Sequence, residues 1–142
     1  MSDKARTRAE AYVRAMWSRD AASQALGMRV IEAGPGRAQV AMTVRADMAN
    51  GHGICHGGLI FALADSAFAF ACNSYGGTVV AAGATIDFLQ PARVGQELLA
   101  TAVECSRSRR TGLYDVSVAN GAGVVIALFR GRSHRIGDNP CS

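Results

Sequence analysis

The sequence has few aromatic side chains, no CxxC pair and no long apolar run, and each absence excludes a class of protein. Aromatic residues make up 6% of the 142 positions and do not interleave with the basic ones, so we expect no base-stacking surface for nucleic acid. The N-terminus is polar, so we expect no signal peptide. The longest apolar run, Leu59 to Cys72, contains Asp65 and is too short to span a membrane. These absences predict a cytoplasmic protein.

The cysteines lack the spacing of a metal site or a disulfide framework. We expect reduced, mostly buried thiols at the four irregularly spaced positions, Cys55, Cys72, Cys105 and Cys141. His52, Cys55 and His56 form an HxxCH cluster, but a fourth ligand at useful spacing is missing, so we expect no metal. Adjacent residues rarely point at each other, which also disfavours Cys55 as a nucleophile activated by His56.

The overall composition is that of one globular domain. About half of the residues are apolar and 18% are charged, with a net charge of +4 that suits an anionic small molecule. Glycine and alanine are abundant, so we expect close helix–sheet packing and close contacts between subunits. We divide the chain into an N-terminal helical segment (1–27), a main domain (28–137) and a loose tail (138–142).

Hydrophobic periodicity predicts an α+β protein in which one apolar helix lies against an antiparallel sheet. Residues 4–25 carry helix formers with one apolar face, and Gly27 is a plausible stop. The segment LIFALADSAFAFACN (59–73) is apolar nearly all round, which is typical of an enclosed helix. A glycine-rich loop at 46–58 precedes it. Strand candidates lie at 28–33, 39–44, 79–89, 96–107, 111–119 and 124–134.

The loop from Asn50 to Gly58 runs directly into the apolar helix. The first turn of a helix has N–H groups without internal partners, and its dipole favours negative charge. Glycines there, including Gly57 and Gly58, let a ligand approach the backbone. Asn50 adds a side-chain donor, so these groups suit an oxyanion hole. A glycine-rich turn that only caps the helix is an equally weighted interpretation.

Asp65 indicates a functional site more specifically than the loop does. Burying an isolated carboxylate within an apolar helix costs several kcal/mol of folding free energy unless it is paired or neutral. It either plays a structural role or works at a cleft, as a general base for water or as a nucleophile. His56 either orders the loop or donates to a carbonyl.

Three arginines, Arg107, Arg109 and Arg110, lie between two predicted strands. Guanidinium groups suit phosphate recognition, so these residues are candidates for binding the phosphates of coenzyme A. A solvated basic rim is the commoner fate of such residues.

The segment NGHGICHGGLIFALADSAFAFACNS resembles the signature of the PaaI-type hotdog thioesterases of phenylacetic acid degradation. The resemblance continues through TIDFLQPA, RRTGLYDV and ALFRGRSHRIG and covers about residues 21–137. It implies a hotdog fold, an antiparallel sheet wrapped around one central helix. It also implies hydrolysis of phenylacetyl-CoA, its hydroxylated forms or similar acyl-CoA thioesters. No cofactor is implied, since coenzyme A is part of the substrate.

The same resemblance assigns roles to individual residues. It implies that Asp65 is the catalytic carboxylate, that the Gly57 N–H polarises the thioester carbonyl, and that Asn50 lies near the attacking water. His56 matches the motif histidine. The implied assembly is a dimer of dimers, with Asp65 acting across an interface on the partner's Asn50–Gly58 loop.

One departure from the family pattern concerns the residue that positions the water. Some relatives carry a Ser or Thr near the strand from Val79 to Thr85, where this chain has Ala81, Ala82, Gly83 and Ala84. Only Thr85 keeps a hydroxyl, so we take it as the candidate at that position.

Two alternatives remain open. A dehydratase acting on acyl-CoA or acyl-carrier protein would pair His56 with the helix carboxylate. A non-catalytic acyl-CoA-binding protein would be unaffected by Asp65→Asn.

Overall fold

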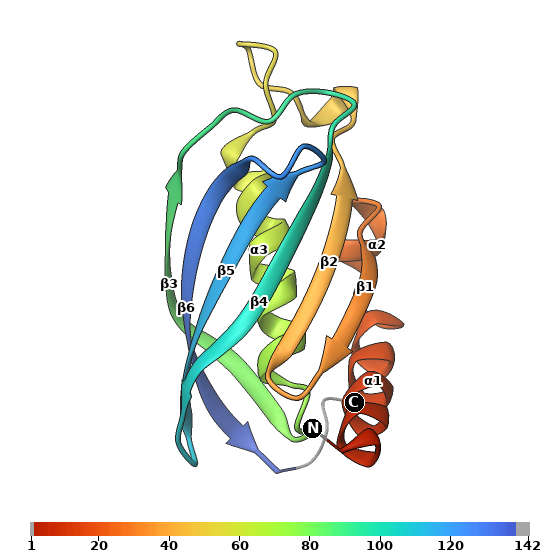
Figure 1. The fold of residues 1–142 in the computed structure, drawn as a ribbon, viewed down its shortest axis with the longest axis vertical. Helices are drawn as coiled ribbons and strands as arrows, with labels where there is room; N and C mark the ends of the chain where they lie inside the picture. Colours follow the sequence, from red (N-terminus) through yellow and green to blue (C-terminus); the bar gives the residue numbers. More distant parts are fainter. Residues whose placement is uncertain (1, 139–142) are drawn as a thin grey trace.

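Alternating side chains give the C-terminal strands one fully buried face. In strand β5 (Thr111–Asn120), Tyr114, Val116 and Val118 are at most 1% exposed. The residues between them face the other side of the sheet, as a period of two requires. The computed structural model describes residues 2–138, and in it this alternation builds the inner face of a curved sheet (Figure 1).

Six strands form one antiparallel sheet in the order β1-β2-β4-β5-β6-β3. The remaining strands are β1 (Arg29–Gly34), β2 (Arg37–Thr43), β3 (Thr78–Phe88), β4 (Glu97–Arg107) and β6 (Val125–Gly137). All six predicted strands are confirmed, close to their predicted ranges. A short 3-10 helix (Ala46–Met48) and helix α3 (Gly57–Cys72) connect β2 to β3, which therefore reaches the far edge beside β6.

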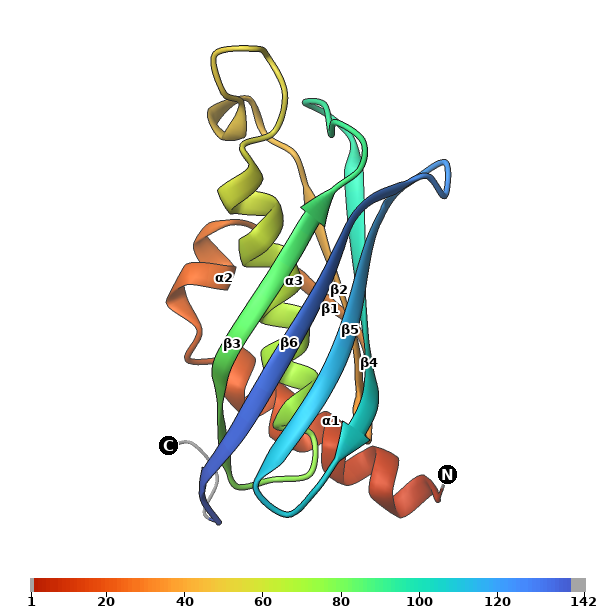
Figure 2. The same ribbon diagram turned by 90° about the vertical axis from the view of Figure 1, so that its left-hand side faces the viewer.

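Helix α3 lies against the concave face of the sheet (Figure 2). Its side chains at Leu63, Ala64, Ala67 and Phe68 are at most 1% exposed. The helix approaches the sheet so closely that a Cβ atom added at Gly131 of β6 would come within 2.8 Å of the Phe68 ring. This arrangement confirms the hotdog fold and the close helix–sheet packing that small residues predicted.

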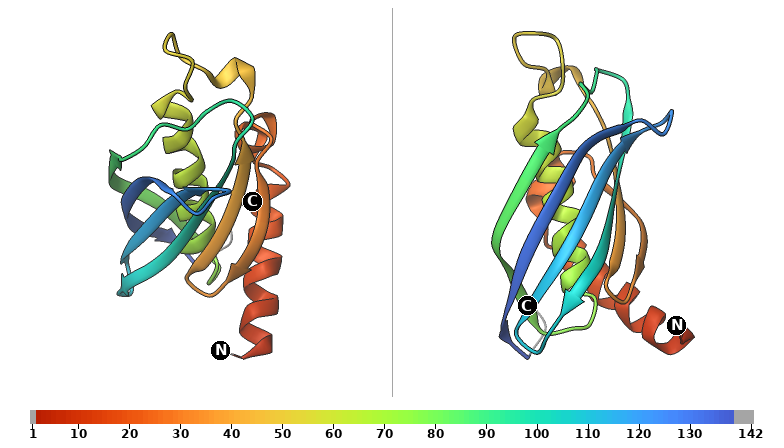
Figure 3. Two further views of the ribbon diagram at one scale, coloured as in Figure 1. Left: turned by 45° about the horizontal axis from the view of Figure 1, so that its top comes forward. Right: turned by 60° about the vertical axis from the view of Figure 1, so that its left-hand side comes forward.

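The single N-terminal helix predicted over 4–25 is wrong, because the chain forms two helices there. Helix α1 (Asp3–Trp17) lies alongside β1, and helix α2 (Ala21–Ala25) lies beside α3 (Figure 3). The break occurs because the Asp20 side chain caps a new helix by accepting from the Ser23 N–H at 2.9 Å. Gly27 does end the second helix, with a φ of 73°.

Strand β3 forms an open edge of the sheet. In residues 2–138 it pairs only with β6, and large apolar side chains are exposed on it or just after it: Val80 at 41%, Phe88 at 51% and Leu89 at 50%. An edge of this length is a ready template for pairing with another strand. No helix in the described part of the chain is long and apolar enough to cross a membrane.

Candidate functional site

The loop before α3 is held in place by its own backbone. The Asn50 side-chain oxygen accepts from the His52 N–H at 2.9 Å, and the Asn50 N–H donates to the Ile54 carbonyl at 2.8 Å. The His56 N–H donates to the Met48 carbonyl at 2.8 Å, and the Cys55 N–H donates to the Ala92 carbonyl at 2.7 Å. The oxygen of Asn50 is therefore used internally, while its side-chain NH₂ makes no hydrogen bond within residues 2–138.

Two backbone N–H groups at the start of α3 are free. His56 is the residue before the helix, and its carbonyl accepts from Leu59 N–H at 3.0 Å and from Ile60 N–H at 3.4 Å. The Gly57 and Gly58 N–H groups have no acceptor in the described chain. The helix dipole adds partial positive charge at this end. The position therefore suits an oxygen that gains negative charge.

The Phe88 ring from β3 lies directly over Gly57. A Cβ atom added at Gly57 would be 3.0 Å from the tip of the ring, which leaves little room for a larger residue. Around Gly58 there is more space, since the nearest atom to an added Cβ there is the His56 ring at 3.7 Å. Phe88 is half-exposed, so part of its ring is accessible to a ligand.

Asp65 lies half-buried two turns along α3 from these amides. Within residues 2–138 its carboxylate makes no hydrogen bond and no ion pair. Burial raises the pKa of Asp65 above its usual range, and the negative charge of nearby Asp20 raises it further. A carboxylate held in this way is a stronger base than an exposed one.

The alternative of a Cys55 nucleophile loses support from the geometry. Cys55 is buried, and burial raises the pKa of its thiol, whereas a reactive cysteine needs a lowered one. Its sulfur lies 3.6 Å from the His56 backbone oxygen. Cys72 is also buried, and burial raises the pKa of its thiol to about 12. Cys105 on β4 is exposed, although the sequence predicted mostly buried thiols. Cys141 lies outside the described residues.

Comparison with known proteins places this loop and helix in a family. A model of the thioesterase superfamily matches residues 52–127. The acyl-coenzyme A thioesterase PaaI of Escherichia coli is 51% identical over 123 residues, which cover 87% of this chain and 88% of that protein. This chain belongs to the thioesterase superfamily.

Solved structures resemble this thioesterase along most of its length. The structure of E. coli PaaI, from the phenylacetic acid degradation operon, matches with a TM-score of 0.94 at 47% identity and covers 95% of this chain and 98% of that chain. A Streptococcus mutans protein bound to acetyl CoA matches with a TM-score of 0.76 at 25% identity, covering 79% and 90%. Both comparisons agree with the hotdog fold described above.

The free amides and Asp65 lie well apart along helix α3. Gly57 and Asp65 are separated by eight residues, or about 12 Å along a helix axis. Gly58, Ala62, Asp65 and Ala69 follow each other along one side of α3 that the sheet does not cover completely. Within one chain, the two groups therefore lie about two helical turns apart on the same side of α3.

Thr85 lies on the other face of the sheet. Val79 packs on the core, and strict alternation would place Thr85, six residues later, on the same face. A register shift between Ala81 and Gly83 reverses the alternation, so Ile86 packs inward. Thr85 instead lines a groove on the convex face with Asp115 and Ser117. In one subunit it does not share a site with Gly57 or Asp65.

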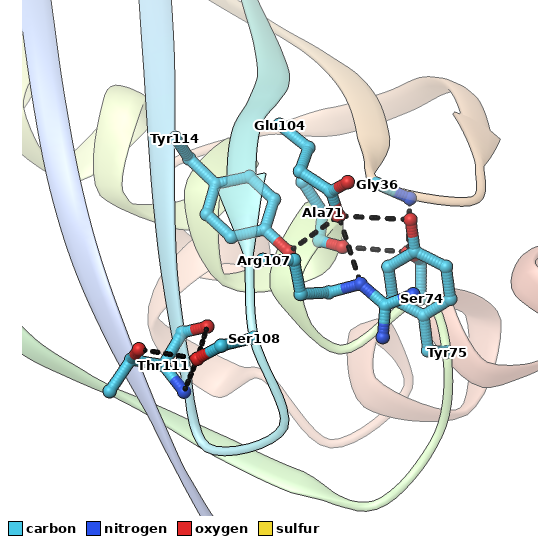
Figure 4. A network of polar contacts seen from close by, with 9 residues as sticks. All are labelled: Gly36, Ala71, Ser74, Tyr75, Glu104, Arg107, Ser108, Thr111 and Tyr114. Atoms are coloured by element: carbon cyan, nitrogen blue, oxygen red, sulfur yellow. Dashed lines mark hydrogen bonds and ion pairs between the residues drawn. The ribbon is translucent and has the colours of Figure 1, made fainter.

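The three candidate arginines lie at the opposite end of α3. They line a small recess beside Cys72, the last residue of a helix about 24 Å long. Arg107 is already engaged, because its Nε lies 3.2 Å from Glu104 and its guanidinium stacks 3.6 Å from the centre of the Tyr75 ring (Figure 4). Arg109 and Arg110 are exposed in the β4–β5 turn and are free to contact a ligand.

The sequence interpretation missed two residues near the site. The contact of Phe88 with Gly57 depends on the register shift in β3, which leaves no local signal in the sequence. Asp20 was not considered, although an aspartate followed by good helix formers is a recognised helix start and would have indicated it.

Proposed function

We propose that this thioesterase hydrolyses acyl-coenzyme A thioesters, with the Gly57 amide polarising the carbonyl and Asp65 activating water. The observation that carries the proposal is the pair of unpartnered amides at the start of α3, followed on the same helix by a half-buried carboxylate. The similarity to E. coli PaaI, an acyl-coenzyme A thioesterase, supports the substrate class.

In the proposed reaction, Asp65 takes a proton from water as the water oxygen attacks the thioester carbon. The carbonyl electrons move to the oxygen, which accepts hydrogen bonds from the Gly57 N–H and its neighbour Gly58. The oxyanion then collapses and the coenzyme A thiolate leaves. The raised pKa of Asp65 favours proton abstraction. No metal or cofactor takes part.

A second route makes Asp65 the nucleophile, through a mixed anhydride that water resolves. Single-turnover hydrolysis in oxygen-18 water detects this route when water attacks the Asp65 carboxyl carbon of the anhydride, because the label then enters Asp65 rather than the acid. Only a nucleophilic Asp65 leaves unlabelled acid on the first turnover.

The proposed site is shared between two subunits. The separation of about 12 Å between Gly57 and Asp65 along the helix axis supports a site that needs both subunits. A partner strand that pairs with the open edge of β3 would continue the sheet and bring a second α3 close to the first. Asp65 of one subunit would then face the loop from Asn50 to Gly58 of the other. We propose that such dimers pair further into tetramers.

The remaining residues of the loop have supporting roles in this proposal. The free side-chain NH₂ of Asn50 is available near the attacking water, and His56 fixes the start of α3 through its carbonyl. At the other end of the subunit, Arg109 and Arg110 are the candidates for the coenzyme A phosphates, because Arg107 is committed to Glu104 and Tyr75.

The acyl group favoured by this site is aromatic. Phe68 and Phe70 are only 1% exposed and belong to the core, whereas Phe61 and Phe88 are partly exposed. Phe88 covers Gly57, and Phe61 lies one turn later on the same helix, with its ring edge-on to Phe129 at 5.3 Å. These two rings suit a phenylacetyl or hydroxyphenylacetyl group, which would stack beside the reacting carbonyl.

The proposal is tested by assaying the parent enzyme and Asp65→Asn on phenylacetyl-, hydroxyphenylacetyl-, benzoyl- and straight-chain CoA esters. We expect aryl esters to be hydrolysed fastest and Asp65→Asn to lose about a hundred- to ten-thousandfold in kcat. Asp3→Asn, an exposed charge change in α1, is the control and should be unaffected. Hydration of an enoyl-CoA without thioester hydrolysis would indicate a dehydratase instead, and full activity of Asp65→Asn would reject the role of Asp65.

A further inference from the structure

A chain of hydrogen bonds fastens α2 to α3 at the residue next to Asp65. The Asp20 carboxylate accepts from the Ser23 N–H at 2.9 Å and from the Ser23 hydroxyl at 2.6 Å. The Ser23 hydroxyl also lies 2.9 Å from the hydroxyl of Ser66. Each hydroxyl has one proton, so Ser66 donates to Ser23 and Ser23 donates to Asp20. The chain runs in one direction and ends on a carboxylate.

This chain is shielded from water where the two helices meet. Ser23 is only 2% exposed, although most of α2 is exposed. A buried hydroxyl without partners costs about 1–3 kcal/mol, so Ser23 and Ser66 hold each other in place. The contact fixes the orientation of α3 one residue past Asp65.

The same contact puts a second negative charge near Asp65. The charge of Asp20 adds to burial in raising the pKa of Asp65. The other titratable neighbour of Asp65 on α3 is Cys72. The charge of Asp65 raises the pKa of the Cys72 thiol, and the charge of Arg135 on β6 lowers it. No cation in residues 2–138 forms an ion pair with Asp65. Asp20 is therefore the charged group that acts on Asp65 here, and replacing it by asparagine removes the charge while keeping the cap of α2.

We propose that Asp20 is a positioning residue for Asp65, holding α2 against α3 through Ser23 and Ser66 and keeping a negative charge beside the reactive carboxylate. The proposal rests on the function proposed above. Asp20 contacts Ser23 rather than the substrate, so it acts on the reaction only through Asp65. Its effect is to make Asp65 a stronger base.

The decisive variant is Asp20→Asn. Its side-chain oxygen still caps α2, and the hydroxyl chain can reverse its direction, so only the charge is lost. We expect the acid limb of the kcat/KM profile to move to lower pH, with the plateau kcat within about twofold of the parent. Asp3→Asn makes the same charge change in the first turn of α1 and should leave the profile in place.

An acid limb that coincides with the parent's in Asp20→Asn would overturn the proposal, even if that variant is less stable. If Asp20→Asn does not fold, Asp20→Ser is used instead, because serine is also a strongly preferred capping residue and carries no charge. The acid limb of its kcat/KM profile should move to lower pH in the same way. Asp65→Asn separates the two hypotheses. If it stays active, the proposed function fails; if it is inactive while the Asp20 variants keep the parent profile, only the role of Asp20 fails.

Discussion

At the scale of single residues, the proposed mechanism depends on one backbone N–H, that of Gly57, which a substitution can remove. Gly57 is the first residue of α3, where proline is well tolerated, and His56 before it has an extended backbone with ψ of 132° that suits a following proline. Gly57→Pro therefore removes the proposed oxyanion donor without breaking the helix. We expect a loss of about a hundred- to a thousandfold in kcat.

The matched control for this variant is Gly57→Ala, which also crowds Phe88 but keeps the N–H. It should retain most of the activity, with circular dichroism showing that both variants are folded. Equal losses in the two variants would assign the effect to crowding rather than to the amide.

Asp65 should also cost stability at neutral pH. The pKa of Asp65 is higher in the folded protein than in the unfolded chain. The protein therefore keeps its full stability at a pH below the pKa of Asp65 in the unfolded chain, and loses part of it as the pH rises through the pKa of Asp65 in the folded protein. Asp65→Asn stays neutral and avoids this loss. Thermal unfolding should therefore show a higher Tm for Asp65→Asn than for the parent at pH 7, and the difference should disappear at about pH 3. A lower Tm at pH 7 would contradict the raised pKa.

At the scale of helices and strands, the closest approach of α3 to the sheet is at Gly131. An added Cβ there would meet the Phe68 ring at 2.8 Å, in a region with little freedom to relax. We expect Gly131→Ala to lower the free energy of unfolding by about 1–3 kcal/mol in urea titrations. Gly121→Ala is the control, because no atom lies within 4 Å of the added Cβ, and it should change stability by less than about 0.5 kcal/mol.

Most elements could be predicted from the sequence because their signals are local. Alternation marks the strands, and Asn-Gly is a typical hairpin turn signal: Asn120 accepts from the Ala122 and Val124 N–H groups in the turn between β5 and β6. The break at Asp20 was missed because a cap is one side-chain hydrogen bond within a run of helix formers. The face of Thr85 was missed because the register shift in β3 leaves no clear mark in a run of small residues. The wrapped sheet and the assembly came from the resemblance alone.

At the scale of the whole molecule, the proposed shared site predicts complementation between two inactive variants. In a mixed dimer of Asp65→Asn and Gly57→Pro subunits, one site carries both defects and the other carries neither. Random mixing makes about half of the dimers mixed, so about a quarter of the parent activity should return after the two proteins are unfolded and refolded together. Mixtures that remain as inactive as the separate variants would place Gly57 and Asp65 in the same site of one subunit.

The position of β3 also has a consequence for how the chain is made. In the described chain β3 pairs only with β6, which is the last strand to be synthesised. At translation speeds of about 5–20 residues per second, β3 is made several seconds before β6, and until then neither of its edges is paired. A ribosome that stops before Val125 would release a chain in which β3 has no strand of its own chain to pair with, so synthesis of β6 (Val125–Gly137) decides whether this edge is covered or is left to aggregate.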